Sequence, residues 1–381
     1  MLDFLLISMR SPKRGVTEIY PKFIAKETSD LMIRGGDFYA IWDEEKKLWS
    51  TKEHDAIRII DRELDKFAKE KRSDIHDDIV RVLHLWDTDS GMIDKWHKYC
   101  QKQMWDKYVT LDEKLIFSDM EVKKEDYASK KLNYPLKKGS HDAYDKLIGT
   151  LYSEEERHKI EWAIGCIVSG DSKTVQKFLV LYGSAGTGKS TILNIIQELF
   201  DGYHSTFDAK ALGQNGASFA LEVLKSNPLV AIQHDGNLSR IEDNTRLNSL
   251  VSHETMPVNE KFKSTYSSSF KTFLILGTNS PVKITDAKSG LLRRLIDVTP
   301  TGNKVPVREY NSLMKRIKFE FGAIAYHCLE VYKKDPGYYD NYVPLAMLSA
   351  TNDFYNYVLD SSYVFEESNG VSLKTAWRSE E

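Results

Sequence analysis

Short apolar runs alternate with amphipathic stretches in the middle of the chain, and this alternation predicts its core. The run Phe178–Tyr182 precedes an amphipathic stretch that begins at Ile192, and a helix is also predicted over Ala217–Leu224. Strands that are apolar along their whole length and alternate with helices are typical of a parallel sheet covered by helices on both faces. We therefore predict an α/β core whose other strands are Leu229–Ile232, Phe273–Gly277 and Leu295–Val298.

Before this core, the pattern changes to that of a mixed α+β domain. Phe38–Trp42 and Leu48–Trp49 flank a charged turn, which predicts a hairpin packed by aromatic side chains. Apolar residues from Ile57 to Phe67 recur at the spacing of one helix face, and a second helix is predicted over residues 77–86. Because interior packing is the commoner use of tryptophan, we expect the tryptophans here to pack in the core rather than stack on bases.

The predicted domains are residues 1–145, 146–304 and 305–381. Linker-like residues around 132–141 indicate the first boundary, and two helical stretches then lead to the strand at Phe178. Tyr310, Leu313, Ile317 and Phe321 repeat at helical spacing in the last part, which predicts a helical segment that packs behind the core. Its final residues suggest the start of an incomplete module.

Composition excludes several protein classes. The chain has 381 residues, 41% hydrophobic and 29% charged, as in an ordinary globular protein. No apolar run reaches the roughly 18 residues that span a bilayer, so we expect a cytoplasmic protein without a membrane partner. Cys100, Cys166 and Cys328 lack metal-ligand spacing, which predicts buried free thiols. Because the net charge is only −3, contact with nucleic acid requires a local basic cluster.

The loop between the first strand and its helix carries the clearest motif. Glycines allow backbone angles closed to other residues, so that N–H groups point at phosphate oxygens while the following helix presents its positive dipole end. Lys189 would reach the β- and γ-phosphates of ATP, and the Ser190 hydroxyl would bind Mg²⁺. The predicted nucleotide site is Gly183, Ser184, Ala185, Gly186, Thr187, Gly188, Lys189, Ser190 and Thr191.

Two further strands end in polar residues. Asp235 follows Leu229–Ile232, and Asn279 follows Phe273–Gly277. Because ligands gather at the carboxyl ends of parallel strands, both should lie beside the glycine loop. An acid delivered there suits Mg²⁺-assisted hydrolysis, so Asp235 is the predicted metal-supporting acid.

These elements, in this order, resemble the superfamily 3 helicases of viruses and phages, and particularly the helicase part of phage and poxvirus primase-helicases. Gly183–Thr191 resembles Walker A and Leu229–Asp235 resembles Walker B. Asn279 looks like the family's sensor asparagine, and Gly290–Leu295 looks like its arginine-finger segment. The resemblance covers about residues 145–305 and implies a P-loop NTPase core of the AAA+ type.

The same resemblance implies partners and further site residues. Val258–Ser264 is similar to the family's DNA-contacting hairpin, whose basic residues here are Lys261 and Lys263. It implies a homohexamer in which Arg294, or failing it Arg293, reaches the nucleotide of a neighbouring subunit, and single-stranded DNA passes through the channel. A separate primase or origin-binding protein is a further expected partner. A surface strand can carry two such lysines, and a surface can carry two such arginines, without these roles.

One position departs from the family. Members commonly carry two adjacent acids at the end of Walker B, whereas this chain has His234 and Asp235. Either Asp235 serves both metal and water, or another acid such as Glu254 helps. His234 itself is predicted to be a packed or hydrogen-bonded histidine rather than a base.

The sequence favours an ATP-dependent ring helicase that acts in the DNA replication of a phage, virus or mobile element. One alternative is a ring ATPase that loads or remodels DNA or protein without unwinding, and another is a P-loop kinase for a small molecule. A kinase needs neither a channel hairpin nor an arginine from a neighbour, so a monomer in solution would favour the kinase.

Overall fold

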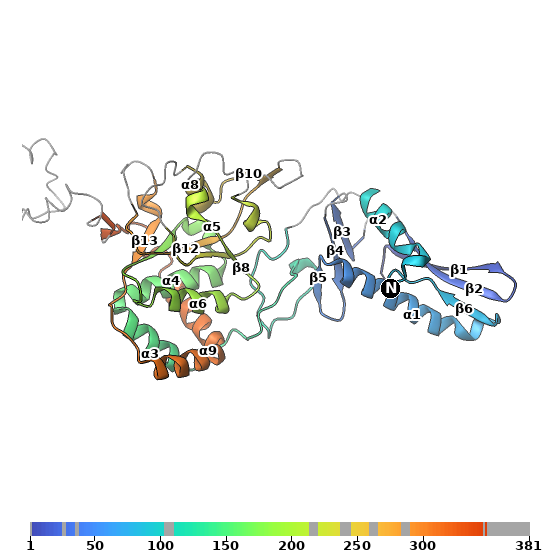
Figure 1. Cartoon of the computed structure of the whole chain (residues 1–381), viewed down its shortest axis with the longest axis horizontal. Coiled ribbons are helices and arrows are strands. Elements are labelled where there is room, and N and C mark those ends of the chain that lie inside the picture. The colour runs from blue at the N-terminus through green and yellow to red at the C-terminus, as the bar shows by residue number, and fades with distance from the viewer. Residues whose placement is uncertain are drawn as a thin grey trace, which may run out of the picture. The chain divides into compact units, whose positions relative to one another are not determined.

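The computed structural model describes residues 2–24, 28–34, 38–102, 110–212, 220–236, 245–258, 266–282, 290–345 and 347–348 (Figure 1). The chain divides into two compact units. The first unit comprises Met1–Lys138 with Phe200–His204 and Ser226–Leu229. The second unit comprises Gly139–Leu199, Ser205–Lys225 and Val230–Glu381, so that the segment after residue 305 belongs to the same unit as the predicted ATPase core.

The first unit contains two small sheets and two main helices (Figure 1). One sheet has the order β1–β2–β6, and the other has the order β3–β4–β5. A core of buried apolar side chains joins the first sheet to the helices. The elements are β1 (Leu5–Lys13), β2 (Val16–Phe23), β3 (Leu31–Arg34), β4 (Phe38–Asp43), β5 (Leu48–Ser50), α1 (Glu53–Lys71), η1 (Arg72–Asp74), β6 (Ile79–Val82), η2 (Thr88–Ser90), α2 (Met92–Lys102) and η3 (Lys124–Asp126).

The aromatic hairpin predicted from the sequence is confirmed. β4 and β5 pair antiparallel, and Trp42 lies directly opposite Trp49 in the register. Their ring centroids are 5.7 Å apart at 64°, the edge-to-face arrangement that aromatic quadrupoles favour. Trp42, Trp49 and Trp96 are buried, as expected for core residues, whereas Trp86 is 69% exposed. Trp105 lies outside the described residues.

The helix predicted over Ile57–Phe67 is confirmed as part of α1, but the helix predicted over residues 77–86 is wrong. Residues Ile79–Val82 form β6, which pairs parallel to β2. The segment is rich in β-branched residues, which fit a pleated surface better than a helix. A free strand edge of β2 was available to it, and the sequence pattern of so short a segment does not show that edge.

The second unit is built on a five-stranded sheet of order β13–β7–β12–β9–β8. β7 pairs parallel with β12 and β13, and β12 pairs parallel with β9. All four predicted core strands are therefore confirmed, in a mixed α/β unit. The strands are β7 (Phe178–Tyr182), β8 (His204–Thr206), β9 (Val230–Gln233), β12 (Phe273–Thr278) and β13 (Leu295–Val298), with a separate antiparallel pair β10 (Met256–Val258) and β11 (Tyr266–Ser268).

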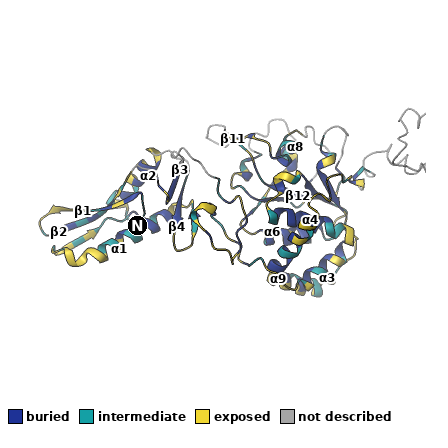
Figure 2. Cartoon of the chain, turned by 180° about the vertical axis from the view of Figure 1, so that it is seen from behind, coloured by how far each residue is buried: buried dark blue, intermediate teal, exposed yellow. Residues whose placement is uncertain are grey.

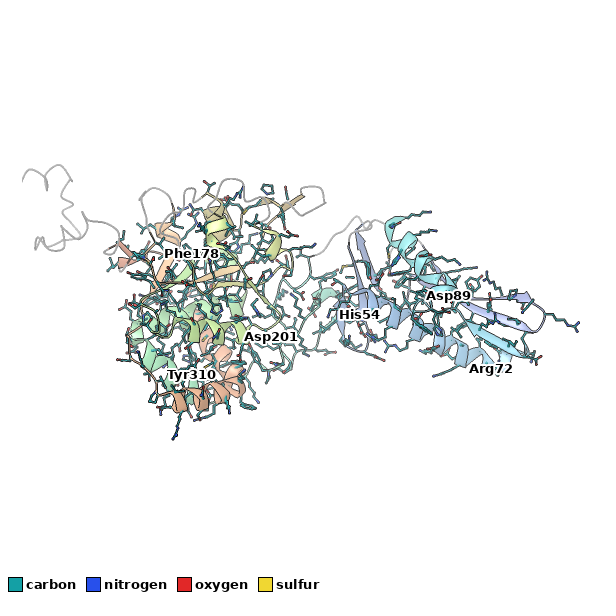
Figure 3. All side chains as sticks on the ribbon, viewed as in Figure 1. His54, Arg72, Asp89, Phe178, Asp201 and Tyr310 are labelled. Atoms are coloured by element: carbon teal, nitrogen blue, oxygen red, sulfur yellow. The ribbon has the colours of Figure 1, made fainter. Side chains whose placement is uncertain are left out.

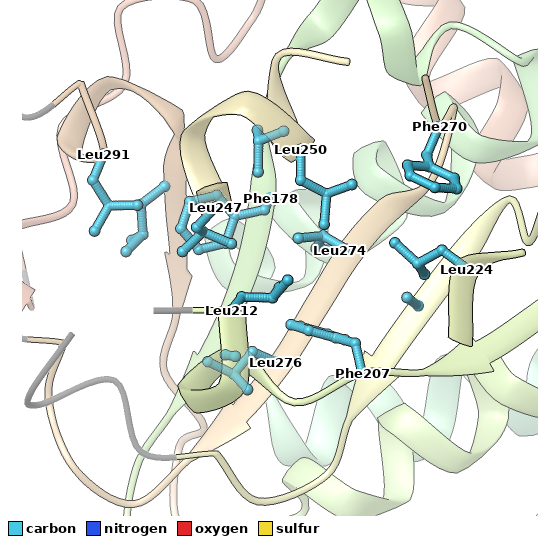
Figure 4. Packing of buried hydrophobic residues seen from close by; sticks show 14 of the residues in the cluster. Phe178, Phe207, Leu212, Leu224, Leu247, Leu250, Phe270, Leu274, Leu276 and Leu291 are labelled. Atoms are coloured by element: carbon cyan, nitrogen blue, oxygen red, sulfur yellow. The ribbon is translucent and has the colours of Figure 1, made fainter. Parts of the chain in front are cut away.

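Helices cover both faces of this sheet. One face packs apolar residues of α7 and α8 onto β7, β9, β12 and β13, including Phe178 and Leu274 (Figure 4). α6 contacts β12 and α4 contacts β13. The helices are α3 (Asp142–Leu151), α4 (Glu154–Ser169), α5 (Ser172–Val175), α6 (Lys189–Leu199), α7 (Ala209–Leu212), α8 (Thr245–Val251) and α9 (Val307–Lys334), with turns η4 (Glu222–Leu224) and η5 (Leu292–Arg294).

Of the helix predicted over Ala217–Leu224, the structure describes residues 220–224, and these contain only the 3-10 turn η4. The two helical stretches predicted before β7 are confirmed as α3 and α4. Ser153 caps α4 because its hydroxyl accepts a hydrogen bond from the Glu156 N–H, and Gly170 ends the helix at a φ of 82°. A serine cap and a left-handed glycine therefore define the two ends of α4.

The amphipathic helix predicted after residue 305 is α9, which packs against α4 and α3. Leu313, Ile317 and Ile324 are buried on this face. Glu320 of α9 accepts hydrogen bonds from the N–H groups of Ala143 and Tyr144, at 3.1 and 3.0 Å, and so places a carboxylate at the N-terminus of α3. α9 is thus an integral part of the second unit.

Gly165 of α4 is expected to be required for this packing. A Cβ added to Gly165 would lie 2.0 Å from the carbonyl oxygen of Cys328 in α9, closer than atoms can approach. We expect Gly165→Ala to lower the free energy of unfolding by about 1–3 kcal/mol, the usual range for overpacking. Denaturant unfolding measures it. The control is Gly149→Ala in α3, where the added Cβ meets nothing within 4 Å, and it should leave stability equal or raise it by up to ~1 kcal/mol.

The three cysteines are free and buried, as predicted. Burial raises the pKa of the Cys100 and Cys166 thiols to about 12, so both are protonated and unreactive at neutral pH. No helix among the described residues is long and apolar enough to cross a membrane.

Candidate nucleotide-binding site

The loop that joins β7 to α6 carries glycines in a left-handed backbone conformation. β7 ends at Tyr182, and α6 begins at Lys189. Gly186 and Gly188 have φ values of 75° and 97°, a left-handed backbone conformation that other residues rarely adopt. The N–H groups of the loop and of the first turn of α6 therefore gather at the positive end of an 11-residue helix.

The strand ends that carry the other predicted residues lie beside this loop. β12 lies between β7 and β9, with all three strands parallel. The Gly183 N–H donates to the Thr278 carbonyl at 3.3 Å, and the Gly236 N–H donates to the Gly277 carbonyl at 2.8 Å. These bonds place Asn279 between the glycine loop and Asp235 at the carboxyl edge of the sheet.

Lys189 joins the loop to Asn279. Its Nζ donates to the carbonyl oxygens of Gly183 and Ser184 at 2.7 and 2.8 Å, and to Oδ1 of Asn279 at 2.8 Å. The side chain is buried, and burial lowers the pKa of its ammonium, while the charge of Asp235 acts in the opposite direction. Among the described residues, its three hydrogen-bond acceptors are all uncharged, so the site holds a positive charge without a carboxylate in contact.

The turn that carries Asn279 is fixed by its neighbours. The Thr278 hydroxyl donates to the Ser280 carbonyl at 2.8 Å and accepts from the Ser280 N–H at 3.1 Å. Thr278 is fully buried. The amide of Asn279 is therefore aimed by a rigid turn rather than by a free loop, as a residue that positions a reacting molecule requires.

Lys189, Asp235 and Asn279 line one cavity of about 410 Å³ in the second unit. From the predicted set it includes Ala185, Gly186, Gly188, Lys189, Ser190, Thr191, Asp235 and Asn279. The volume and the mixture of apolar and polar walls suit a nucleotide-sized ligand. The structure thus brings together residues that lie almost a hundred positions apart in the chain.

Five residues that line the cavity were not predicted from the sequence. They are Leu151, Asn303, Lys304, Val305 and Tyr310. Tyr310, labelled in Figure 3, lies in the first turn of α9. The Thr301 N–H donates to the Leu151 carbonyl at 2.9 Å and fixes this segment to the end of α3. A signal was present, because the segment follows the fourth apolar strand, and the rule that ligands gather at carboxyl ends applies to β13 as well.

His234 is hydrogen-bonded, as predicted. Its Nε2 lies 3.1 Å from Oε1 of Gln197 in α6, and burial lowers the pKa of its imidazole. It therefore lies in the cavity wall as an uncharged group at neutral pH. It cannot replace a second acid.

Glu254, the alternative second acid, does not lie in the described cavity wall. It follows α8 and accepts a hydrogen bond from the Ser249 hydroxyl at 2.6 Å. Among the described residues that line the cavity, Asp235 is the only carboxylate. The described residues also contain no group of three or more metal-ligating side chains. One carboxylate and one hydroxyl nevertheless fit Mg²⁺, which is usually held by one or two carboxylates together with substrate phosphates.

The two arginines lie at the amino-terminal ends of the strands, on the side of the sheet away from the glycine loop. They immediately precede β13, whereas the glycine loop follows β7, and the two strands are parallel neighbours. A strand of four residues separates these edges by roughly 13 Å. Neither arginine is among the residues that line the cavity of its own chain.

Arg293 and Arg294 differ in their surroundings. Arg294 is buried, and its guanidinium donates to the Ser252 hydroxyl at 2.6 and 3.0 Å and to the Gly290 carbonyl at 2.8 Å. The Arg293 side chain is exposed, while its backbone carbonyl accepts a hydrogen bond from the buried Lys177 ammonium at 2.5 Å. Arg293 therefore has a fixed backbone and an accessible side chain, whereas Arg294 has a fixed side chain.

The predicted DNA-contacting residues, Lys261 and Lys263, lie outside the described residues. The strands on either side of them are described. β10 and β11 pair antiparallel, with Val258 opposite Tyr266, so residues 259–265 connect the two arms of a hairpin.

One protein-family model matches part of the chain, and several solved structures resemble it. Residues 181–294, less than half of the chain, match a family described as one of unknown function, DUF5906. The matched segment begins at the end of β7 and ends at Arg294. No curated protein matches the chain.

The solved structures that resemble it include three of the C-terminal region of NrS-1. Two are an apo structure and an A-form apo structure of this region. Their identities to this chain are 15% and 12%, with a TM-score of 0.43 for each. The matches cover 61% and 71% of this chain, and 54% and 66% of those chains. The chain thus spans less than two thirds of either structure.

Proposed function

We propose that this chain is an ATP-hydrolysing ring helicase that translocates on single-stranded DNA during replication of a phage, virus or mobile element. The observation that carries the ATPase part is the contact between Lys189 and Asn279 at the edge of a parallel sheet. A buried ammonium without a carboxylate in contact favours an anionic ligand, and the glycine loop presents N–H groups to the same place.

Several residues of the cavity have a defined role in this proposal. Lys189 and the N–H groups of the loop neutralise the β- and γ-phosphates, and Asn279 orients the attacking water. Ser190 and Asp235 would hold Mg²⁺, which supplies further neutralisation of phosphate charge. Leu151 and Tyr310 also line the cavity, and there they can contact the base and ribose.

The position of the arginines supports action between subunits. Because Arg293 and Arg294 lie at the amino end of β13, they cannot approach the nucleotide of their own chain without a rearrangement of the sheet. If either contributes to hydrolysis, it must reach the nucleotide of a neighbouring copy. A ring satisfies this requirement for every subunit, and the proposed ring is a homohexamer.

Three measurements on the wild-type chain test the proposal. Native mass determination with an ATP analogue and single-stranded DNA should give a hexamer. ATP hydrolysis should rise when single-stranded DNA is added, and a forked duplex should be unwound. ATP hydrolysis without unwinding would favour a loading or remodelling ATPase, whereas a monomer that phosphorylates a small molecule would contradict the ring helicase.

We expect Asp235→Asn to bind ATP and lose hydrolysis. Asp235 is the only carboxylate among the described cavity residues, so no other described acid can take its place at the metal. The loss should be at least about a hundredfold, the scale of removing one transition-state interaction. A fluorescent ATP analogue measures binding, and phosphate release measures turnover. Glu254→Gln is the control, and it should keep wild-type turnover. Full activity of Asp235→Asn would show that the metal is held elsewhere.

We expect Lys261→Ala/Lys263→Ala to weaken binding of single-stranded DNA and to keep basal ATP hydrolysis. Each lost phosphate contact should reduce the salt-dependence slope by about 0.7. A salt titration with labelled DNA measures the slope, and ATPase activity is measured in parallel. Lys210→Ala, an exposed lysine of α7, is the control. Unchanged affinity and slope would exclude this hairpin from the DNA path.

A further inference from the structure

One face of the β1–β2–β6 sheet in the first unit is packed, and the other is open to solvent. Leu5, Ile7 and Ile19 lie on the packed face and are buried in the core shared with α1 and α2. The strand register places the alternate residues on the opposite face. We call this opposite face the basic face, and it comprises Leu6, Ser8, Arg10, Glu18, Tyr20, Lys22, Ile79 and Arg81.

The basic face and its hairpin carry an excess of positive charge. Residues 4–24 contain Arg10, Lys13, Arg14 and Lys22 but only one acid, Glu18. All four cations are exposed. Figure 2 shows exposed positions in the β1–β2 hairpin. Arg10 pairs with Glu18 at 2.8 Å, whereas in the part of the chain that the structure describes no ion pair is recorded for the other three.

The third strand extends this charge across the sheet. Arg81 of β6 is exposed and lies in register with Glu18, which lies in turn beside Arg10. The acidic residues closest to Arg81 in sequence are Asp77 and Asp78, which precede β6. Asp77 accepts a hydrogen bond from Thr17 at 2.5 Å, on the packed side of β2. The basic face therefore presents three cations and one carboxylate that is already paired.

An aromatic ring lies among these cations. Tyr20 is on β2, the central strand, with the Arg10 guanidinium 5.1 Å and the Lys22 ammonium 5.6 Å from its ring centroid. Tyr20 is half-buried, so part of its side chain packs against the apolar core of the first unit and part is accessible to a ligand. An aromatic face between cations is the arrangement that lets a base stack while its neighbouring phosphates are neutralised.

We propose that the basic face binds single-stranded nucleic acid. Charge complementarity points to a polyanion, and Tyr20 selects among polyanions. A duplex keeps its base faces stacked inside and offers none to Tyr20, whereas a single strand offers both phosphates and base faces. This site lies in the first unit and does not depend on ATP hydrolysis by the second unit. It gives the first unit a role that the proposed helicase function does not assign.

Binding of the full chain to a labelled single strand of about 20 nucleotides, without ATP, tests this site. Lys22→Ala/Arg81→Ala should bind at least about tenfold more weakly at moderate salt, and its salt slope should be smaller by about 1.4, or 0.7 per lost phosphate contact. Tyr20→Leu keeps an apolar side chain and loses the aromatic ring. It should weaken binding by about fivefold to a hundredfold while the salt slope stays the same, because stacking releases no counterions.

The matched control is Lys66→Ala/Lys69→Ala, which removes two exposed cations from α1 in the same unit. It should bind like the wild type. Lys22→Glu provides a second test of the same position, with circular dichroism and unfolding midpoints as checks on the fold. Basal ATP hydrolysis should be unchanged in all these variants, so a failure of this site is distinguishable from a failure of the ATPase proposal.

Three results would overturn the proposal. In the first, Lys22→Ala/Arg81→Ala has the wild-type affinity and slope. In the second, the α1 control loses as much affinity as the basic-face variant. In the third, duplex DNA or vesicles rich in phosphatidylserine bind more tightly than the single strand, and this binding, rather than single-strand binding, is lost in the variants.

Discussion

Lys189→Ala is expected to abolish ATP hydrolysis while the protein stays folded. Lys189 is the only residue of the described structure whose cationic group contacts both the glycine loop and Asn279. Its ammonium would stabilise phosphate charge as that charge redistributes in the transition state. Removing one such donor typically costs about 10²–10³ in rate, and a full positive charge should cost at least as much.

The stability of Lys189→Ala should not fall together with its rate of ATP hydrolysis. A buried ammonium that contacts only neutral oxygens contributes little to folding, because its desolvation costs free energy that a carboxylate would otherwise offset. We expect the thermal midpoint of Lys189→Ala to equal that of the wild type or to exceed it slightly. Lys189→Met, which keeps the aliphatic stem, should behave in the same way.

The measurement combines phosphate release with thermal unfolding, and Lys210→Ala is the matched control. That lysine is exposed on α7 and does not line the cavity, so its loss should change neither quantity. Turnover at the wild-type rate by folded Lys189→Ala would refute the assignment of the site. Loss of turnover in the control as well would show that the effect is not specific to the cavity.

The second large effect is expected from the arginines that precede β13. An arginine finger contributes roughly 10³–10⁵ in rate and little to ground-state affinity. Arg293→Ala should therefore lower hydrolysis by about this factor, keep ATP affinity and leave stability unchanged, because its side chain is exposed. Arg294, which the family resemblance favours over Arg293, stays a predicted finger. Its substitution should affect stability as well as activity.

Arg294→Ala is expected to lower stability as well as activity. Its buried guanidinium donates to Ser252 and Gly290, and these acceptors would lose their partner. Ser252→Ala separates the two effects, since it removes an acceptor of Arg294 and keeps the guanidinium. If Arg294 is the finger, it must leave Ser252 to reach a neighbour, and Ser252→Ala should keep or raise the rate.

Mixing experiments test whether the finger acts between subunits. Lys189→Ala and the arginine variant are each expected to be inactive alone. A mixed ring, however, would contain interfaces where an intact cavity meets an intact finger. Partial recovery of hydrolysis on mixing is the expected result. A monomeric wild type together with no recovery would exclude a finger from a neighbour, and full activity of both arginine variants would exclude a finger at these positions.

The sequence by itself determined the parts of this protein that local rules govern. Four runs that are apolar along their whole length, each followed by a polar residue or loop, indicate parallel strands. Parallel strands place their carboxyl ends on the same side of the sheet. Gly183, Asp235 and Asn279 could therefore be brought together without coordinates. The hairpin of Trp42 and Trp49 and helix α1 followed from spacing in the same way, because period and turn chemistry are encoded within a few residues.

Only the tertiary structure decided what depends on contacts between distant segments. Residues 79–82 became a strand because an edge of β2 was free to pair with them, which their own pattern does not record. Asn303, Lys304, Val305 and Tyr310 line the cavity because the hydrogen bond of Thr301 to Leu151 fixes their segment there. Arg293 and Arg294 are adjacent and chemically identical, yet Ser252, 42 positions earlier, holds one and leaves the other exposed. Burial and hydrogen bonding across such separations arise from packing, and packing is a property of the folded chain rather than of any local pattern.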